Sequence, residues 1–189
     1  GSGVLDSPAA GSRTIVNTNT LAISDGSGIA TNYTLTNGTL TMTIVPRSTT
    51  VSGTKTYDGT TNVASSNLTS FSNLAGSDTL SLSGTGTIST ADVGTGKTVN
   101  TSGLTIDNSS GVGSNYTLSA ATVNVTERVI GLSGVRAFDG TNNASSADLS
   151  ISNLVSGENL TLSGSGTVPN ATVEMNKAIT LGSLSISDG

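Results

Sequence analysis

Val51-Ser-Gly-Thr-Lys-Thr-Tyr-Asp-Gly-Thr60 returns 81 residues later as Leu132-Ser-Gly-Val-Arg-Ala-Phe-Asp-Gly-Thr141. One residue is then lost, and the 189-residue chain continues to match itself at an offset of 80, so that Leu80-Ser-Leu-Ser-Gly84 is repeated as Leu160-Thr-Leu-Ser-Gly164. Self-similarity at a fixed period is the signature of a repeat protein. The sequence therefore predicts tandem structural units of about 80 residues.

The beginning of the chain is a third, partial copy that matches the other end of the repeat. Leu21-Ala-Ile-Ser-Asp-Gly-Ser-Gly28 matches Leu104-Thr-Ile-Asp-Asn-Ser-Ser-Gly111, and Thr43-Ile-Val-Pro-Arg47 matches Asn124-Val-Thr-Glu-Arg128. We therefore expect a tail plus the C-terminal part of one repeat in residues 1–47, a complete repeat in 48–128 and the N-terminal part of a further repeat in 129–189. The repeat alone leaves open the residue at which a structural module begins.

Within the repeat, apolar residues alternate with small polar residues, as they do in half-buried strands. The alternation is clearest in Leu40-Thr-Met-Thr-Ile44, Leu80-Ser-Leu82, Leu104-Thr-Ile106, Thr122-Val-Asn-Val125, Leu149-Ser-Ile151 and Leu184-Ser-Ile186. Turn signals separate these runs, at Asn37-Gly38, Asp58-Gly59, Ser83-Gly84, Asp139-Gly140 and Ser163-Gly164. A short helical turn is expected only within residues 64–74. The predicted fold class is predominantly β, in tandem sandwich-like or β-grasp-like modules of about 80 residues.

The composition is narrow, because Ser, Thr, Gly and Asn make up 104 of the 189 residues and His, Cys and Trp are absent. The chain lacks an imidazole and a thiolate, and no Ser has a neighbour that would activate it as a nucleophile. We therefore predict that the protein is not an enzyme and needs no cofactor or metal. Charged residues are only 10% of the chain and the aliphatic residues are regularly spaced, which argues against disorder.

Charge and hydropathy exclude two classes of partner. The net charge is −5, and the 7 basic residues are scattered, whereas a nucleic-acid surface needs clustered Lys and Arg. No apolar run approaches the length of a membrane-spanning helix, so membrane insertion is not expected. Residues 1–11 form a polar tail without a signal-peptide pattern, so we expect a secreted protein with this sequence to be an excerpt of a longer precursor.

Two motifs place an aromatic residue before Asp-Gly: Tyr57-Asp58-Gly59 and Phe138-Asp139-Gly140. We interpret them as a buried aromatic anchor followed by a tight turn, in which Gly supplies a positive φ and Asp binds a nearby backbone N–H. The alternative is that Asp58 and Asp139 are calcium ligands between modules. That alternative is weaker, because calcium sites need several oxygen ligands at close spacing and no dense acidic loop is present.

A second aromatic motif is Asn32-Tyr33-Thr-Leu35, which recurs as Asn115-Tyr116-Thr-Leu118. Each Tyr follows a run of turn-forming residues and is predicted to open a strand as a core or interface anchor, with its hydroxyl bonded to the backbone. A role for Tyr33 and Tyr116 in stacking on carbohydrate is the alternative.

Lys97 and Lys177 are the basic pair that recurs as Lys. In a chain without Cys, they raise the hypothesis of an intramolecular Lys–Asn isopeptide cross-link, which requires a buried Lys, an Asn acceptor and a protonated carboxyl group. No recurring acidic residue is placed to assist, so we favour a solvated Lys at a strand edge that discourages edge pairing.

The residues Lys55-Thr-Tyr-Asp-Gly-Thr60, Leu80-Ser-Leu-Ser-Gly84, Asp92-Val-Gly-Thr95 and Asn115-Tyr-Thr-Leu118, in this order, resemble the YDG-type repeats of filamentous-hemagglutinin-like bacterial adhesins exported by two-partner secretion. The resemblance covers residues 48–189 well and 12–47 as a partial copy. It departs from the pattern at Arg136, Phe138 and residues 170–173. It implies a non-catalytic stalk, secreted to the surface of a Gram-negative cell or into its biofilm matrix.

The leading functional hypothesis is therefore a stalk or extender whose partners are neighbouring repeats of the same protein. A second hypothesis is that the Thr, Asn and Ser side chains bind an extracellular polysaccharide or a host surface. A third follows from the order of the partial copies: the tail end of one molecule could be completed by the first strands of the next, giving strand-complemented fibres.

Overall fold

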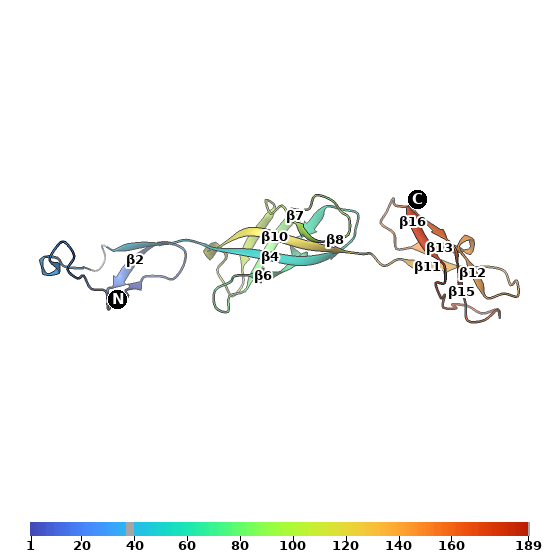
Figure 1. The fold of residues 1–189 in the computed structure, drawn as a ribbon, viewed down its shortest axis with the longest axis horizontal. Coiled ribbons are helices and arrows are strands. Elements are labelled where there is room, and N and C mark those ends of the chain that lie inside the picture. Colours follow the sequence, from blue (N-terminus) through green and yellow to red (C-terminus); the bar gives the residue numbers. More distant parts are fainter. Residues whose placement is uncertain (37–39, 189) are drawn as a thin grey trace. The chain divides into compact units, whose positions relative to one another are not determined.

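The computed structural model describes residues 1–36 and 40–188 and is predominantly β, as the sequence predicts (Figure 1). Its strands are β1 (Val4–Leu5), β2 (Gly11–Asn17), β3 (Thr41–Ile44), β4 (Arg47–Thr56), β5 (Asn62–Ala64), β6 (Leu68–Ser72), β7 (Leu80–Thr87), β8 (Gly94–Thr98), β9 (Leu104–Asn108), β10 (Tyr116–Thr126), β11 (Gly131–Gly134), β12 (Asn143–Ser145), β13 (Leu149–Ser152), β14 (Leu160–Ser163), β15 (Ser165–Thr167) and β16 (Ser185–Asp188). Short 3-10 turns lie at η1 (Ala30–Asn32), η2 (Ser65–Asn67), η3 (Gly113–Asn115) and η4 (Ser146–Asp148).

Each of the six alternating runs lies wholly or partly in a strand, which confirms the period-two prediction. A helical turn was expected only within residues 64–74, where η2 lies, but η1, η3 and η4 show that this restriction was wrong. The turn predicted at Asn37-Gly38 lies outside the described residues. Among those residues, no helix has the length and apolar character needed to cross a membrane.

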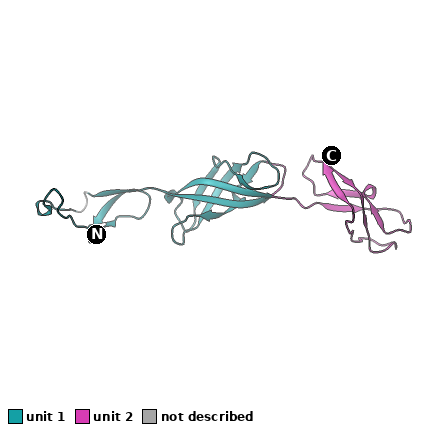
Figure 2. Ribbon diagram, viewed as in Figure 1, with its two compact units in different colours: residues 1–55, 61–125 teal, residues 56–60, 126–189 magenta. Residues whose placement is uncertain are grey.

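The chain divides into two compact units (Figure 2). The first holds residues 1–55 and 61–125, and the second holds residues 56–60 and 126–189. Residues 56–60 include the first aromatic-Asp-Gly motif. That motif therefore belongs to the compact unit of the repeat that follows it in the sequence.

The complete repeat is built from two sheets, one with the order β6-β4-β10-β8 and one with the order β5-β7-β9. Alternate residues of both sheets are buried, as expected when two sheets share one core. The buried apolar residues of this repeat are Val51, Val63, Leu68, Leu80, Ile88, Val99, Tyr116, Ala121, Val123 and Val125. This core contains one aromatic ring, in agreement with the aliphatic composition of the chain.

Strands β4 and β10 lie side by side and run in the same direction (Figure 1). Near their starts, the Ser119 hydroxyl donates to the carbonyl of Thr49 at 2.9 Å. At their far ends, the backbone N–H of Tyr57 donates to the carbonyl of Thr126 at 2.8 Å. The two outer strands of this sheet run in the opposite direction to β4 and β10: β8 pairs antiparallel with β10, and β6 pairs antiparallel with β4.

The predicted turn at Ser83-Gly84 is wrong, because Gly84 lies inside β7 and pairs with Leu104 of β9. Gly84 has φ +90°, and a Cβ at this position would lie 2.0 Å from the carbonyl oxygen of Gly103. Gly164 repeats this arrangement between β14 and β15, with φ +83° and the carbonyl oxygen of Ser183 at 2.2 Å. Both glycines therefore mark a close approach of two backbones within a sheet, which also selects for Gly.

The partial copies form parts of the same architecture. In the first unit, β1, β2 and β3 make a small antiparallel sheet in which β2 is central. In the second unit, three two-stranded sheets pair β11 with β13, β12 with β15 and β14 with β16. By the repeat alignment, these three pairs correspond to β4 with β6, β5 with β7, and β7 with β9 of the complete repeat.

Candidate functional site

The recurring Asp-Gly-Thr turns are built by the side chain of their Asp. Asp58 Oδ1 accepts hydrogen bonds from the backbone N–H of Thr60 at 2.9 Å and from its hydroxyl at 3.0 Å. Gly59 has φ +74°, a conformation that favours Gly. The second copy repeats the geometry, because Asp139 Oδ1 accepts from the N–H and hydroxyl of Thr141 at 2.8 and 2.9 Å.

The basic residue three positions before each Asp donates a hydrogen bond to a backbone carbonyl that follows the turn. Lys55 is 4% exposed, and its ammonium group donates to the carbonyl of Asn62 at 2.7 Å. In the second copy, Arg136 donates to the carbonyl of Thr141 and forms an ion pair with Asp139. The backbone hydrogen bond from Thr141 and then the Arg136 guanidinium lower the pKa of Asp139 from 3.8 to about 2.

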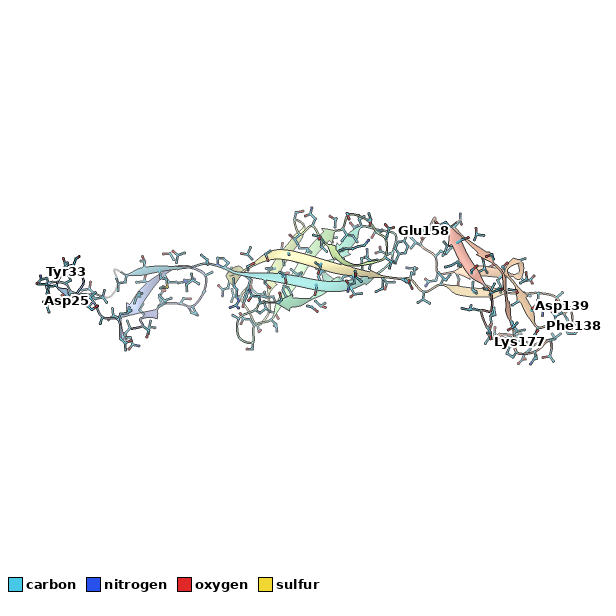
Figure 3. The ribbon with its side chains drawn as sticks, in the orientation of Figure 1. Asp25, Tyr33, Phe138, Asp139, Glu158 and Lys177 are labelled. Atoms are coloured by element: carbon cyan, nitrogen blue, oxygen red, sulfur yellow. The ribbon has the colours of Figure 1, made fainter. Side chains whose placement is uncertain are left out.

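The aromatic residues of these motifs are not the buried anchors that we expected. Phe138 is 68% exposed, in a loop of the second unit beside Asp139 (Figure 3). Tyr57 is half-buried, and its hydroxyl donates to Glu158 Oε1. The motif lies beyond the end of β4, so its ring does not follow the inward alternation of that strand. The Tyr57 hydroxyl thus has a hydrogen-bond partner, whereas Phe138, at the matching position of the next copy, has no hydroxyl.

The first motif also packs closely on the loop after β13. A Cβ added to Gly59 would lie 2.8 Å from Cγ1 of Val155. Tyr57, Gly59, Val155 and Glu158 all belong to the second unit. The Asp-Gly turn of the complete repeat is thus a part of the following unit and contacts residues 155–158 there.

The two Tyr of the second aromatic motif lie in different environments. Tyr116 opens β10 and is 7% exposed, and its hydroxyl donates to Asp78 and accepts from the N–H of Ala75 at 3.1 Å. The hydrogen bond to the Asp78 carboxylate raises the pKa of the Tyr116 phenol above its usual value. Tyr33 is 69% exposed and follows η1 without opening a strand, so the anchor prediction is wrong for this copy. In the complete repeat, the partners of Tyr116 come from the connection between β6 and β7, which carries Ala75 and Asp78.

Comparison with known families decides what these motifs belong to. The family model of the YDG domain matches residues 38–124 and again 126–189. The chain belongs to the YDG domain family. Neither curated proteins nor solved structures show a match to it.

In both YDG repeats, the recurring Lys attaches to a loop. Lys97 lies on the edge strand β8 and donates to the carbonyl and hydroxyl of Thr90 at 3.1 and 3.0 Å. Lys177 donates to the carbonyl and Oδ1 of Asn170 at 3.0 and 2.6 Å. Glu174 is 3.9 Å from Lys177 but is 63% exposed, whereas the cross-linking chemistry requires a buried, protonated carboxyl group. Position 90 is Thr, so the loop of the first Lys offers no amide there.

A further recurring contact in the YDG repeats was missed at the level of sequence. Arg47 donates through Nε to the carbonyl of Asn73 at 2.8 Å and through Nη2 to its Oδ1 at 2.7 Å. Arg128 binds Asn153 in the same way, at 2.6 and 2.8 Å. We call each of these pairs an Arg–Asn clamp. The signal was available, because both Arg and both Asn recur in the aligned sequence.

The recurring polar side chains of the YDG repeats form hydrogen bonds to other groups of the protein itself. Residues 1–36 and 40–188 contain no group of three or more His, Cys, Asp or Glu side chains that could hold a metal ion. The Asp58 and Asp139 carboxylates bind their own turns. The candidate functional feature is therefore the YDG turn itself, together with residues 155–158 of the same compact unit, which it contacts.

Proposed function

We propose that this chain is a section of a non-catalytic extracellular stalk, in which YDG repeats extend a surface or biofilm-matrix adhesin away from a Gram-negative cell. The observation that carries the proposal is the position of residues 56–60, which come from one repeat and belong to the compact unit of the next. In such an array, each repeat stabilises its neighbour, and stability is approximately a sum over repeats and their contacts.

Two contacts support this coupling between successive copies. The Tyr57 hydroxyl of the complete repeat donates to Glu158 of the copy that follows. On the other side, Asn115 Oδ1 accepts a hydrogen bond at 2.8 Å from the N–H of Ala10, in the N-terminal tail before the partial copy. The second contact joins residues of the first unit only. The complete repeat therefore contacts residues that precede it and residues that follow it in the sequence.

Export as a filamentous-hemagglutinin-like adhesin through two-partner secretion is part of this proposal. It is supported by the motifs shared with those adhesins and by a composition dominated by Ser, Thr, Gly and Asn without Cys. The stalk function is tested in the bacterium that carries the chain, by deleting residues 48–128 from the full-length protein. We expect immunogold label at the far end of the protein to move closer to the cell, with adhesion at that end retained. Label found only inside the cell, or a distance that does not change, would reject the stalk.

Polysaccharide binding is the second candidate, and the exposed aromatic rings favour it. Tyr33 and Phe138 are 69% and 68% exposed, which leaves much of each ring accessible for stacking on sugars. A glycan array probed with the 189-residue chain should then show saturable binding that Tyr33→Ala and Phe138→Ala each weaken. The matched control is Val135→Ala, because Val135 is 93% exposed and has no ring. If the chain shows no saturable binding, polysaccharide binding is rejected and the stalk remains the proposed function.

A further inference from the structure

Two exposed asparagines of the complete repeat lie at the ends of β9, the outermost strand in the order β5-β7-β9. Asn100 lies just before β9, in an isolated bridge with Thr87, and Asn108 is the last residue of the strand. Each begins an Asn-x-Ser triplet, Asn100-Thr-Ser102 and Asn108-Ser-Ser110. This triplet is the acceptor sequence for N-glycosylation, in which the side-chain amide nitrogen receives a sugar. A chain so rich in Asn, Ser and Thr contains such triplets by composition alone, so the geometry of each Asn must distinguish them.

The fold uses only the oxygen of these two side chains. Asn100 Oδ1 accepts a hydrogen bond from the backbone N–H of Ser102 at 3.0 Å, and Asn108 Oδ1 accepts one from the N–H of Gly113 at 2.7 Å. Within residues 1–36 and 40–188, neither Nδ2 donates a hydrogen bond to the protein. Glycosylation replaces one hydrogen of Nδ2 and leaves the amide oxygen as an acceptor. Both contacts therefore survive the modification.

The other copies show that the amide nitrogen is dispensable to the fold at both positions. In the first partial copy, Asp25 is the counterpart of Asn108, and its Oδ1 accepts from the N–H of Ala30 at 2.6 Å in the same way. In the second unit, Thr180 is the counterpart of Asn100 and keeps the same isolated bridge to a Thr. A carboxylate and a hydroxyl contain no amide nitrogen, so Nδ2 is free for chemistry in the complete repeat.

The three other Asn-x-Thr triplets of the complete repeat have less accessible amides. Asn67 is half-buried, and its Nδ2 donates to the carbonyl of Thr54 at 3.4 Å. Asn115 is half-buried and binds the N–H of Ala10. Asn124 lies in β10, which has a strand on each side. The geometry therefore selects the two triplets that flank β9.

We propose that Asn100 and Asn108 are N-glycosylation sites, modified by a transferase that uses a sugar activated as a diphosphate ester. Nδ2 attacks the anomeric carbon, the bond between that carbon and the diphosphate breaks, the diphosphate leaves with the electron pair, and Nδ2 loses a proton. Strand β9 contains neither Lys nor Pro, which often protect an edge strand. A bulky sugar at each end of β9 would obstruct the pairing of another strand along it. This modification does not depend on the stalk function.

The test is peptide mapping by mass spectrometry of the full-length protein, purified from the bacterium that carries the chain. We expect a sugar on the peptides that contain Asn100 and Asn108, and none at Asn67. Asn108→Asp keeps the Oδ1 acceptor, as Asp25 does, so the variant should fold and lose only the sugar at this position. Asn67→Asp is the matched control and should leave the pattern of modification unchanged.

The source of the activated sugar is identified with the unmodified 189-residue chain. It is incubated with the soluble fraction of the same bacterium plus labelled nucleoside-diphosphate sugars, and separately with its membrane fraction, which carries lipid-linked sugars. Label from the first fraction assigns a nucleotide-linked donor, and label from the second assigns a lipid-linked donor. Unmodified Asn100 and Asn108 in the native protein, or modification of Asn67 to the same extent, would overturn the proposal.

Discussion

Arg47 donates hydrogen bonds to two oxygens of Asn73, the backbone carbonyl oxygen and the side-chain Oδ1. Asn73 itself has a left-handed backbone conformation, with φ +58°. The Asn73 amide in turn donates to the carbonyl of Ser48, next to the Arg, at 2.7 Å. The second Arg–Asn clamp has the same parts, with Asn153 at φ +65° and its amide donating to Val129. Asn tolerates the left-handed region, and its side-chain amide can both accept and donate a hydrogen bond. These two properties explain why Asn recurs at this position.

The first prediction concerns this clamp. Asn73→Ala removes the side-chain hydrogen bonds and places a Cβ residue without compensation in the left-handed region, so it should destabilise the first unit by about 1–3 kcal/mol in urea unfolding. Asn73→Gly loses the same hydrogen bonds but relieves the backbone, and should cost clearly less. Equal losses in the two variants would show that backbone conformation does not contribute.

The second prediction concerns Gly84, where β7 and β9 approach closely. Gly84→Ala should destabilise the first unit by more than about 2 kcal/mol, because it combines a positive φ with an overlap between Cβ and the carbonyl of Gly103. Gly76→Ala is the control, since Gly76 also has a positive φ, +53°, but open space around it. Its cost should be about 1–2 kcal/mol. Thermal unfolding of both variants measures the difference, and a similar loss at both positions would contradict the close approach.

The third prediction is a pH dependence of the second Asp-Gly turn. Asp139 has its pKa lowered to about 2 from 3.8, so its folded-state contacts stabilise the turn above the unfolded value and are lost as the pH falls through about 2. NMR titration of the carboxyl group should give this midpoint. Arg136→Gln should raise the pKa only part of the way, because the Thr141 backbone hydrogen bond remains. A wild-type midpoint near 3.8 would contradict the contacts described for this turn.

The fourth prediction concerns the coupling between Tyr57 and Glu158. Tyr57→Phe and Glu158→Ala should each destabilise the second unit slightly, and the double variant should lose less than the sum of the two. A double-mutant cycle should give a coupling of about 0.5–1.5 kcal/mol, the usual range for one hydrogen bond. Glu158→Gln is the matched control, because its amide oxygen can still accept from the Tyr57 hydroxyl, so it should lose less than Glu158→Ala. Strict additivity of Tyr57→Phe and Glu158→Ala would show that the YDG turn is not held by this residue.

The sequence predicted the strands well where alternation alone decides them. Thr122-Val-Asn-Val125 lies in β10, and its Val residues are buried, because a period of two selects one face of a sheet whatever the neighbours are. The Asp-Gly-Thr turns also have local causes, since Asp58 bonds to a residue two positions away. Such features depend on few residues, all close in sequence.

The contacts that sequence reasoning missed join residues distant in the chain. Glu158 lies 101 residues from Tyr57, and no local pattern links them. Gly84 was assigned to a turn because Ser-Gly is a common turn signal, but the need for Gly comes from the backbone of Gly103. Tyr33 and Tyr116 share a motif and still differ in burial, because the partners of Tyr116 are found on a different strand connection. These outcomes depend on tertiary context.

The parallel arrangement of β4 and β10 has a mechanical consequence. The chain enters the complete repeat at the start of β4 and leaves it at the end of β10, so tension on the backbone pulls these two neighbouring strands in opposite directions along their length. The hydrogen bonds between them are then loaded together in shear, and they do not open one after another as in a zipper. A repeat connected in this way resists extension more strongly than a hairpin pulled from its two ends.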